Sequence, residues 1–219
     1  MEYRSIFDII GPIMIGPSSS HTAGATRIGR AARSLLKGEP TWLEIRLYGS
    51  FAKTYRGHGT DVAVVGGILG FSPSNPQIPR ALEIAREIHT DVRIMTDASY
   101  SEHPNTARVR LGNHEEEIEL LAASIGGGNI EILELNGFQV KLTSSSALMI
   151  FHLDRPGVIA GVANLLASRG INIARMAVSR REIGGEALMI IELDQPMTAP
   201  ILNELALAPF VSRAAQMEC

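Results

Sequence analysis

The stretch DRPGVIAGVANLLASRGINIARM, from Asp154 to Met176, decides the fold of the C-terminal part of the chain. Its first four letters, Asp154–Gly157, predict a turn, because proline presets φ and glycine accepts positive φ. Apolar residues then recur on one side of a helical repeat, which predicts a helix over 158–168. Gly170 suits the position just after a helix end. The letters from Ile171 onward predict a strand.

Working outward from this stretch, the same alternation of strand and helix continues in both directions. A strand precedes the turn, and a Gly184-Gly185 hairpin, a strand, a helix and a last strand follow it. The predicted strands are 147–153, 171–179, 187–193 and 210–215, and the second helix is 200–207. The order is βαββαβ, which predicts an antiparallel sheet with both helices on one face.

The clearest seam in the chain is the polar run Thr143–Ser146, whose composition is that of a flexible connection. We therefore expect a first domain over 1–142, a linker over 143–146 and a second domain over 147–219. The first domain shows a mixed α/β pattern. Its predicted helices are 22–37, 61–69 and 78–88, and its predicted strands are 41–48, 92–96, 107–111, 117–122, 129–135 and 138–142. The overall class is α+β.

The composition narrows the classes of function. With 219 residues, 45% hydrophobic content and a net charge of −3, the sequence indicates a soluble globular protein of one or two domains. No segment has the pattern of a signal peptide or of a membrane span. The charge balance gives no basic patch for nucleic acid. We expect a cytoplasmic protein without a membrane or nucleic-acid partner.

The chain has one cysteine, Cys219, as its last residue. A single thiol cannot form an internal disulfide, complete a cysteine zinc site or hold an iron–sulfur cluster by itself. The sequence therefore predicts no metal centre of this kind within the chain, and a reducing compartment.

The run GPSSSHTAGATRIGR, from Gly16 to Arg30, carries the strongest hint of chemistry. Several hydroxyl side chains sit where a helix begins, so they can cap it and leave backbone N–H groups for a carboxylate or phosphate. His21 adds a group that moves protons near neutral pH. Taken alone, the run fits a serine-rich cap with a solvated histidine equally well.

The C-terminal unit resembles an ACT domain over its whole length, on the acidic residue and Pro-Gly after the first strand and the Gly-Ile-Asn-Ile that opens the second. Resemblance to this family implies pairing of two such units and an amino acid or similar effector at their interface. The positions that match its binding residues are Asp154, Pro156, Gly157 and Asn172. A unit that only dimerises remains the alternative.

The N-terminal unit resembles the β chain of iron–sulfur-dependent bacterial L-serine dehydratases. Three motifs carry the resemblance: FDIIGPIMIGPSSSHTAGATRIGRAAR from Phe7 to Arg33, GSFAKTYRGHGTDVAVVGGILG from Gly49 to Gly70, and SIGGGNIEI from Ser124 to Ile132. The unit is also similar to the allosteric substrate-binding type of domain found in some phosphoglycerate dehydrogenases, in which the SSSHT turn is not a working part.

This resemblance implies conversion of L-serine to pyruvate and ammonia without pyridoxal phosphate. It also implies a [4Fe–4S] cluster, and the cysteine count places that cluster on a partner α chain. The ACT unit implies a homodimer of this chain. By the same resemblance His21 and His58 face a joint active site as base and acid in an unassigned order. The substrate carboxylate, or His21 itself, would be held by Ser19, Ser20 and Thr22.

Lys53 is a further candidate for charge complementarity, with a solvated surface lysine as the simpler interpretation. The remaining histidines have no comparable sequence setting, and we expect them to be surface or satisfied core residues: His89, His103, His114 and His152.

Two other functions compete with a catalytic subunit. One is a purely regulatory, amino-acid-sensing subunit, which would have no need of His21. The other is a free-standing phosphate- or nucleotide-binding protein that uses the helix start at Thr22. The chain lacks both a GxGxxG after a strand and a Gly-Lys-Ser/Thr loop, so the second is the weaker.

Overall fold

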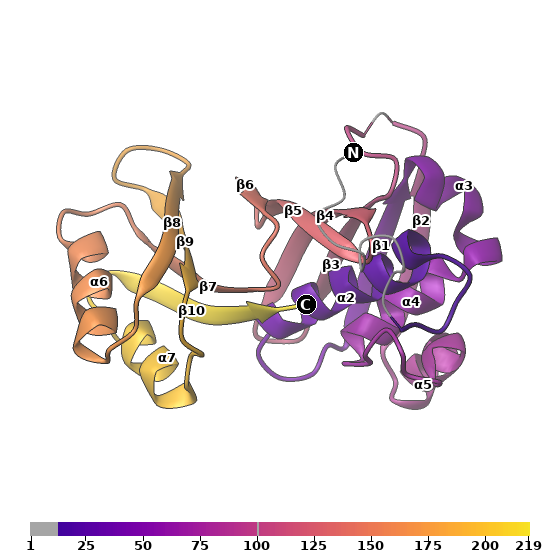
Figure 1. Ribbon diagram of the computed structural model, residues 1–219, viewed down its shortest axis with the longest axis horizontal. Coiled ribbons are helices and arrows are strands. Elements are labelled where there is room, and N and C mark those ends of the chain that lie inside the picture. Colours follow the sequence, from indigo (N-terminus) through magenta and orange to yellow (C-terminus); the bar gives the residue numbers. More distant parts are fainter. Residues whose placement is uncertain (1–12, 100) are drawn as a thin grey trace. The chain divides into compact units, whose positions relative to one another are not determined.

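A computed structural model describes residues 13–99 and 101–219, and the chain forms two compact units (Figure 1). The first unit ends at Thr143, and the second runs from Ser144 to Glu218. The beginning of the first motif, residues 7–12, lies outside the described residues, as does the predicted start of the first domain.

A six-stranded sheet forms the centre of the first unit, with the strand order β2-β1-β3-β4-β5-β6. The strands β1 and β2 run parallel, and every other neighbouring pair is antiparallel. Their bounds are β1 Trp42–Tyr48, β2 Asp91–Asp97, β3 Thr106–Gly112, β4 Glu117–Gly126, β5 Asn129–Leu135 and β6 Phe138–Leu142. All six occur where the sequence pattern predicts strands.

The helices of this unit gather on one face of the sheet (Figure 1). They are the π-helical turn η1 Ser19–Gly24, α2 Ala25–Leu35, α3 Gly49–His58, α4 Thr60–Ile68, the 3-10 turn η2 Ile78–Arg80 and α5 Ala81–Glu87. Helix α3 is not predicted from the sequence, because it buries only Phe51 and so shows almost no apolar repeat. It nevertheless carries His58 at its end, so this missed element positions a predicted site residue.

Two glycines bring α2 and α4 into backbone contact. A Cβ atom added at Gly67 would lie 2.0 Å from the carbonyl oxygen of Thr26, and one added at Gly29 would lie 2.1 Å from that of Val64. No side chain fits at either crossing point. The glycines of α4, which weaken its helical pattern in the sequence, therefore have a packing function.

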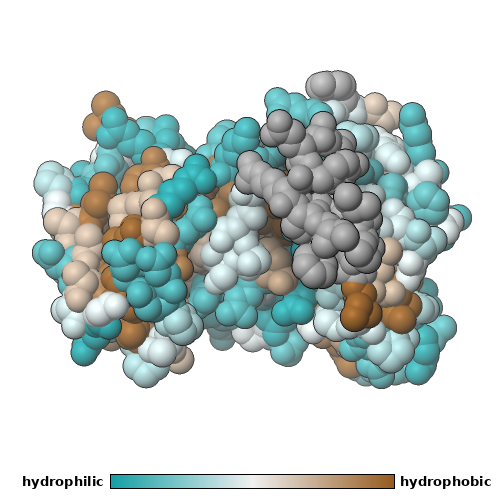
Figure 2. Space-filling view, viewed as in Figure 1, coloured by the Kyte–Doolittle hydropathy of each residue, from teal (hydrophilic) through white to brown (hydrophobic). Residues whose placement is uncertain are grey.

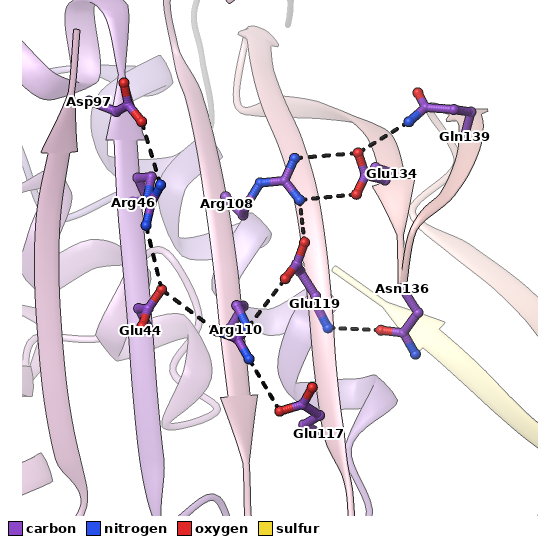
Figure 3. Close-up of polar contacts among 10 residues, drawn as sticks. All are labelled: Glu44, Arg46, Asp97, Arg108, Arg110, Glu117, Glu119, Glu134, Asn136 and Gln139. Atoms are coloured by element: carbon purple, nitrogen blue, oxygen red, sulfur yellow. Dashed lines mark hydrogen bonds and ion pairs between the residues drawn. The ribbon is translucent and has the colours of Figure 1, made fainter. Parts of the chain in front are cut away.

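The opposite face of the sheet carries charges instead of helices, in a ladder of arginines and carboxylates that crosses several strands (Figure 3). At its centre Arg108 donates to Glu119 and to both carboxylate oxygens of Glu134. These bonds, that with Glu134 first, raise the pKa of Arg108. Arg110 continues the ladder to Glu117 and Glu119. This face is polar because alternate residues of each strand point away from the helices.

The second unit is a four-stranded antiparallel sheet with the order β10-β7-β9-β8 and two helices. Its elements are β7 Ser146–Leu153, α6 Val158–Ser168, β8 Ile173–Arg180, β9 Glu186–Leu193, α7 Ala199–Ala206 and β10 Val211–Glu218. This is the predicted βαββαβ order, and the α+β class is confirmed.

Both helices of this unit pack on a shared apolar core. It contains Leu148, Ile150, Val162, Leu166, Ile171, Met189, Ile191, Leu205 and Ala214. Strand β8 forms one edge of the sheet, and five of its eight residues are exposed. Figure 2 shows apolar and polar side chains intermixed over the visible face of this unit.

Candidate functional site

The SSSHT run folds into a single π-helical turn that leads without a break into α2. Ser18 is its N-cap, and the Ser18 hydroxyl accepts a hydrogen bond from the backbone N–H of His21. Single π turns inside helices are rare and occur frequently at functional sites. The predicted serine cap is thus present, but the sequence does not reveal that the turn after it is π-helical.

His21 is nearly buried and has a hydroxyl group at each ring nitrogen. Its Nδ1 lies 3.2 Å from the hydroxyl of Ser20 and 3.3 Å from that of Ser18. Its Nε2 lies 3.2 Å from the hydroxyl of Ser50, which stands at the start of α3. The exposed fraction of His21 is only 8%, so the alternative of a solvated histidine does not hold.

A second imidazole stands against the first. The ring centroids of His21 and His58 are 4.8 Å apart at an interplanar angle of 88°. The ring centroid of Phe51 lies 5.1 Å from that of His21. Burial lowers the pKa of His21, and the charge of His58 lowers it further. Both effects favour the neutral form of His21, in which one ring nitrogen accepts a hydrogen bond and the other donates one.

Several buried polar atoms around this turn have no hydrogen-bond partner among the described residues. They are His58 Nδ1, Thr22 Oγ1, Thr60 Oγ1, Asn105 Oδ1 and Ser124 Oγ. Leaving such groups unpaired in an apolar interior costs free energy, so a cluster of them marks a place where water or a polar ligand belongs. The first unit therefore holds unpaired polar groups on the turn and on segments around it, where water or a polar ligand can bind.

Three of these atoms belong to residues that the sequence did not assign to the site: Thr60, Asn105 and Ser124. The end of β4 contacts the turn, and a Cβ atom at Gly24 would lie 2.0 Å from the hydroxyl of Ser124. The amide of Ser124 donates to the backbone oxygen of Asn105. In the sequence Ser124 only opens the motif SIGGGNIEI, and it is the buried hydroxyl, without a partner among the described residues, that points to a role at the site.

Ser50, which contacts His21, also has no role that the sequence predicts. The amides of Ser50 and Phe51 both donate to the carbonyl oxygen of Pro104, which anchors the start of α3 to the segment before β3. Gly49 at this point has φ of +53° and would collide with Pro104 if it carried a Cβ. Nothing in the letters GSFAK indicates that this serine faces a histidine.

The other predicted residues have simpler settings. Ser19 is half-buried in the turn, and Lys53 is exposed and lines a cavity of about 290 Å³ beside Asp97. His89 and His114 are exposed, as expected, whereas burial lowers the pKa of His103. His152 is 4% exposed, and its Nδ1 lies 2.8 Å from the carbonyl oxygen of Leu153. Its Nε2 has no partner among the described residues, so this buried histidine is only half satisfied.

The predicted effector loop of the second unit is well ordered around Asp154. Its carboxylate accepts from the backbone N–H of Gly184 and from Arg180, and these bonds, in that order, lower the pKa of Asp154. Gly157 caps α6 in the left-handed conformation, at φ of +91°. Pro156 stands between them, as the motif requires.

Asn172 lies at the other end of the same sheet. It precedes β8, and its side chain donates to Asp194 beyond the end of β9. Asp154 follows β7, whose last residue pairs with the first residue of β9. A full strand of eight residues, about 27 Å at 3.4 Å per residue, therefore separates Asn172 from Asp154. The structure does not bring these two predicted effector residues together within one chain.

The described residues do not fit an iron–sulfur cluster. Among them no group of three His, Cys, Asp or Glu side chains could hold a metal ion. The chain has one cysteine, and a cluster needs several thiolates. The histidine pair lies among hydroxyl groups, which are not ligands for such a cluster.

Fold and site together define a protein of two units. One is an α/β unit in which the buried His21 of a hydroxyl-rich turn contacts His58 at the end of α3, and the other is a ferredoxin-like βαββαβ unit. No helix in the described part of the chain is long and apolar enough to cross a membrane.

Comparison with known proteins identifies the family. Residues 5–99 match the family model described as serine dehydratase beta chain, and residues 146–206 match the ACT domain. A probable L-serine dehydratase beta chain of Bacillus subtilis is 50% identical over 99% of both chains. The L-serine dehydratase beta chain of Peptoniphilus asaccharolyticus is 36% identical over 94% of both. This chain belongs to the serine dehydratase beta-chain family and carries an ACT domain.

A more distant relative accounts for the second resemblance. D-3-phosphoglycerate dehydrogenase of Methanocaldococcus jannaschii is 28% identical over 87% of this chain, which corresponds to 36% of its own length. The similarity thus extends over both units of the chain, as part of a longer enzyme.

Proposed function

We propose that this chain is the β subunit of an L-serine dehydratase, L-serine ammonia-lyase, and supplies the histidine pair of an active site shared with an α chain. The observation that carries the proposal is the contact of His58, at the end of α3, with His21, which lies in a turn of three serines. In this proposal residues 1–142 contribute to catalysis and residues 147–219 bind an effector or dimerise.

Dehydration of L-serine needs a base and an acid on the same substrate. The Cα–H bond breaks to a base and the Cβ–O bond breaks as water leaves, and the resulting enamine tautomerises and hydrolyses to pyruvate and ammonia. One neutral and one protonated imidazole are suited to the two proton transfers. The lowered pKa of His21 favours its neutral form, which fits the base, and the neighbouring His58 is placed to serve as the acid.

The substrate carboxylate fits the start of the η1 turn. The amides there belong to a helix start, and Ser19, Ser20 and Thr22 bring hydroxyl groups to the same turn. Thr22 Oγ1 is buried and has no partner among the described residues, which supports a role for it in binding a polar ligand.

The proposal assigns a [4Fe–4S] cluster to the α chain, because the residues of this chain do not fit one. When bound there, a cluster of this kind supplies a Lewis acid for the substrate hydroxyl. The proposed compartment is the reducing cytoplasm, where the single thiol of Cys219 stays reduced.

The test is activity of the assembled α and β chains under anaerobic conditions. We expect His21→Ala and His58→Ala each to lower kcat by at least 100-fold, while His114→Ala, which removes an exposed histidine of the same unit, leaves kcat unchanged. Retention of full activity by both site variants would instead support the regulatory, amino-acid-sensing subunit.

The ACT unit is proposed to form a homodimer through the exposed edge of β8. Antiparallel pairing of two copies of this edge about a two-fold axis places the start of one β8 beside the end of the other. Asn172 of one copy then approaches the Asp154 loop of its partner, which resolves their separation within one chain.

Mixed dimers test this arrangement. Asp154→Ala and Asn172→Ala homodimers each lose both sites for a bound amino acid such as L-serine, whereas the mixed dimer regains one intact site of two. Calorimetric titration with L-serine therefore shows binding only in the mixture, at half the wild-type stoichiometry for each mixed dimer and about a quarter for a randomly exchanged equimolar mixture. If neither variant affects binding, or the wild type binds none, the unit serves dimerisation alone.

A further inference from the structure

We propose that Ser50 is a positioning residue for His21: its hydroxyl accepts the Nε2–H and leaves Nδ1 as the basic nitrogen that faces the serine turn. This inference rests on the proposed function. The contact that carries it is the 3.2 Å separation of Ser50 Oγ and His21 Nε2, between residues 29 positions apart in the sequence.

The two sides of the His21 ring differ in what they offer. At Nδ1 two hydroxyls, those of Ser18 and Ser20, converge on one nitrogen, and both can donate. The Ser18 hydroxyl already accepts the backbone N–H of His21, which leaves its own proton to donate. The two hydroxyls also lie 3.3 Å from each other, so one can donate to the other while the second donates to Nδ1. We therefore assign Nδ1 as the acceptor side. At Nε2 a single hydroxyl stands ready to accept, so the ring proton belongs there.

Ser50 is held more rigidly than a surface serine. Its amide donates to the carbonyl oxygen of Pro104 at 2.6 Å, and its own carbonyl accepts from the hydroxyl of Thr54 one turn later. Phe51, its neighbour in α3, is fully buried and packs on the His21 ring at 5.1 Å. The start of α3 therefore fixes both the plane of the imidazole and the end at which it carries its proton.

The charges around His21 are few, so the hydroxyl at Nε2 has a large influence on its protonation. Of the elements that pack on the turn, α3 contributes His58, whose charge acts on His21. Strand β4 and helix α4 contribute the neutral Ser124 and Thr60. On β5, the carboxylates Glu131 and Glu134 belong to the opposite face of the sheet.

When His21 takes up a proton at Nδ1, its Nε2–H bond to Ser50 becomes a charge-assisted hydrogen bond, which is stronger than the neutral one. Removal of the hydroxyl in Ser50→Ala therefore penalises the imidazolium more than the imidazole. It also lets the neutral ring move its proton to Nδ1, where Ser18 and Ser20 can accept it. Both effects act in the same direction and lower the pKa of His21 further.

Nitrogen NMR on the full-length chain tests this without any catalysis. We expect His21 of the wild type to show the Nε2–H tautomer, Ser50→Ala to shift toward Nδ1–H with a lower pKa, and Ser50→Thr to restore the wild-type pattern. Ser72→Ala, which removes a hydroxyl bonded only to Ser74, is the matched control and leaves the signals unchanged. An unchanged tautomer and pKa in Ser50→Ala would overturn the proposal.

Kinetics of the assembled enzyme separates this inference from the proposed function. We expect Ser50→Ala to lower kcat about tenfold to 100-fold with little change in KM, to move the acid limb of the kcat profile to lower pH, and to be rescued by Ser50→Thr. A normal NMR result together with an active His21→Ala enzyme would refute the catalytic role alone. A uniform loss in Ser50→Ala, with no shift of the pH profile and no rescue by threonine, would show a merely structural serine.

Discussion

Substitution of Gly67 by alanine would separate α2 and α4, the helices that directly follow the two segments with His21 and His58. The new Cβ would lie 2.0 Å from the Thr26 carbonyl oxygen and 2.9 Å from the Arg30 amide, both backbone atoms of α2, so neither can rotate away. The helices must move apart by about 1 Å. Overpacking of this kind costs about 3 kcal/mol, and the better helix propensity of alanine returns about 1 kcal/mol. We expect a net loss of about 2 kcal/mol.

The neighbouring glycine provides the control. At Gly66 a Cβ would meet only side-chain atoms, at 3.4 Å and beyond, so Gly66→Ala should be neutral or stabilising by up to about 1 kcal/mol. Urea unfolding followed by fluorescence of Trp42, the single tryptophan, reports on the first unit. Equal midpoints for the two variants would refute the close crossing of α2 and α4.

Further predictions concern charge. The folded-state pKa of His21 lies below its unfolded value of about 6.5, so the first unit should lose stability as pH falls below about 6.5 and be insensitive above it. Urea unfolding at pH 7.5 and 5.5 measures this dependence, and His21→Gln should flatten it. Arg108→Met leaves the half-buried Glu134 without its guanidinium and should lower the free energy of unfolding by about 1–2 kcal/mol. Arg46→Met removes only ion pairs of 3.6 and 3.9 Å and should lower it by less than about 0.5 kcal/mol. Similar denaturation midpoints for these two variants would contradict the ladder of Figure 3.

Much of the fold is predictable from the sequence because the apolar repeats are local. The β7–α6–β8 segment is an example: its turn residues, its helix repeat and Gly170 all indicate the same structure. Helix α3 fails this test because its contacts with the sheet involve one buried side chain, Phe51. Its existence depends on tertiary contacts, above all the Pro104 carbonyl that receives its first amides.

The sequence predicted several residues of the candidate site but not how these residues face one another. His21 and its serines form one continuous motif, and the resemblance to a family pointed to His58. Ser50 and Ser124 were missed because each reaches His21 or its turn across a large separation in the sequence. A buried hydroxyl in an apolar or glycine-rich stretch has no local pattern, and only the assembled fold shows what it faces.

The central claim is that this chain and an α chain share one active site, and the most direct test is whether activity requires both chains. We would measure pyruvate formation from L-serine, anaerobically and with reconstituted cluster, for this chain alone, for the cysteine-bearing α chain alone and for their mixture. The shared active site predicts turnover only in the mixture. Turnover by the α chain alone, merely modulated by this chain, would contradict the account and leave a regulatory subunit.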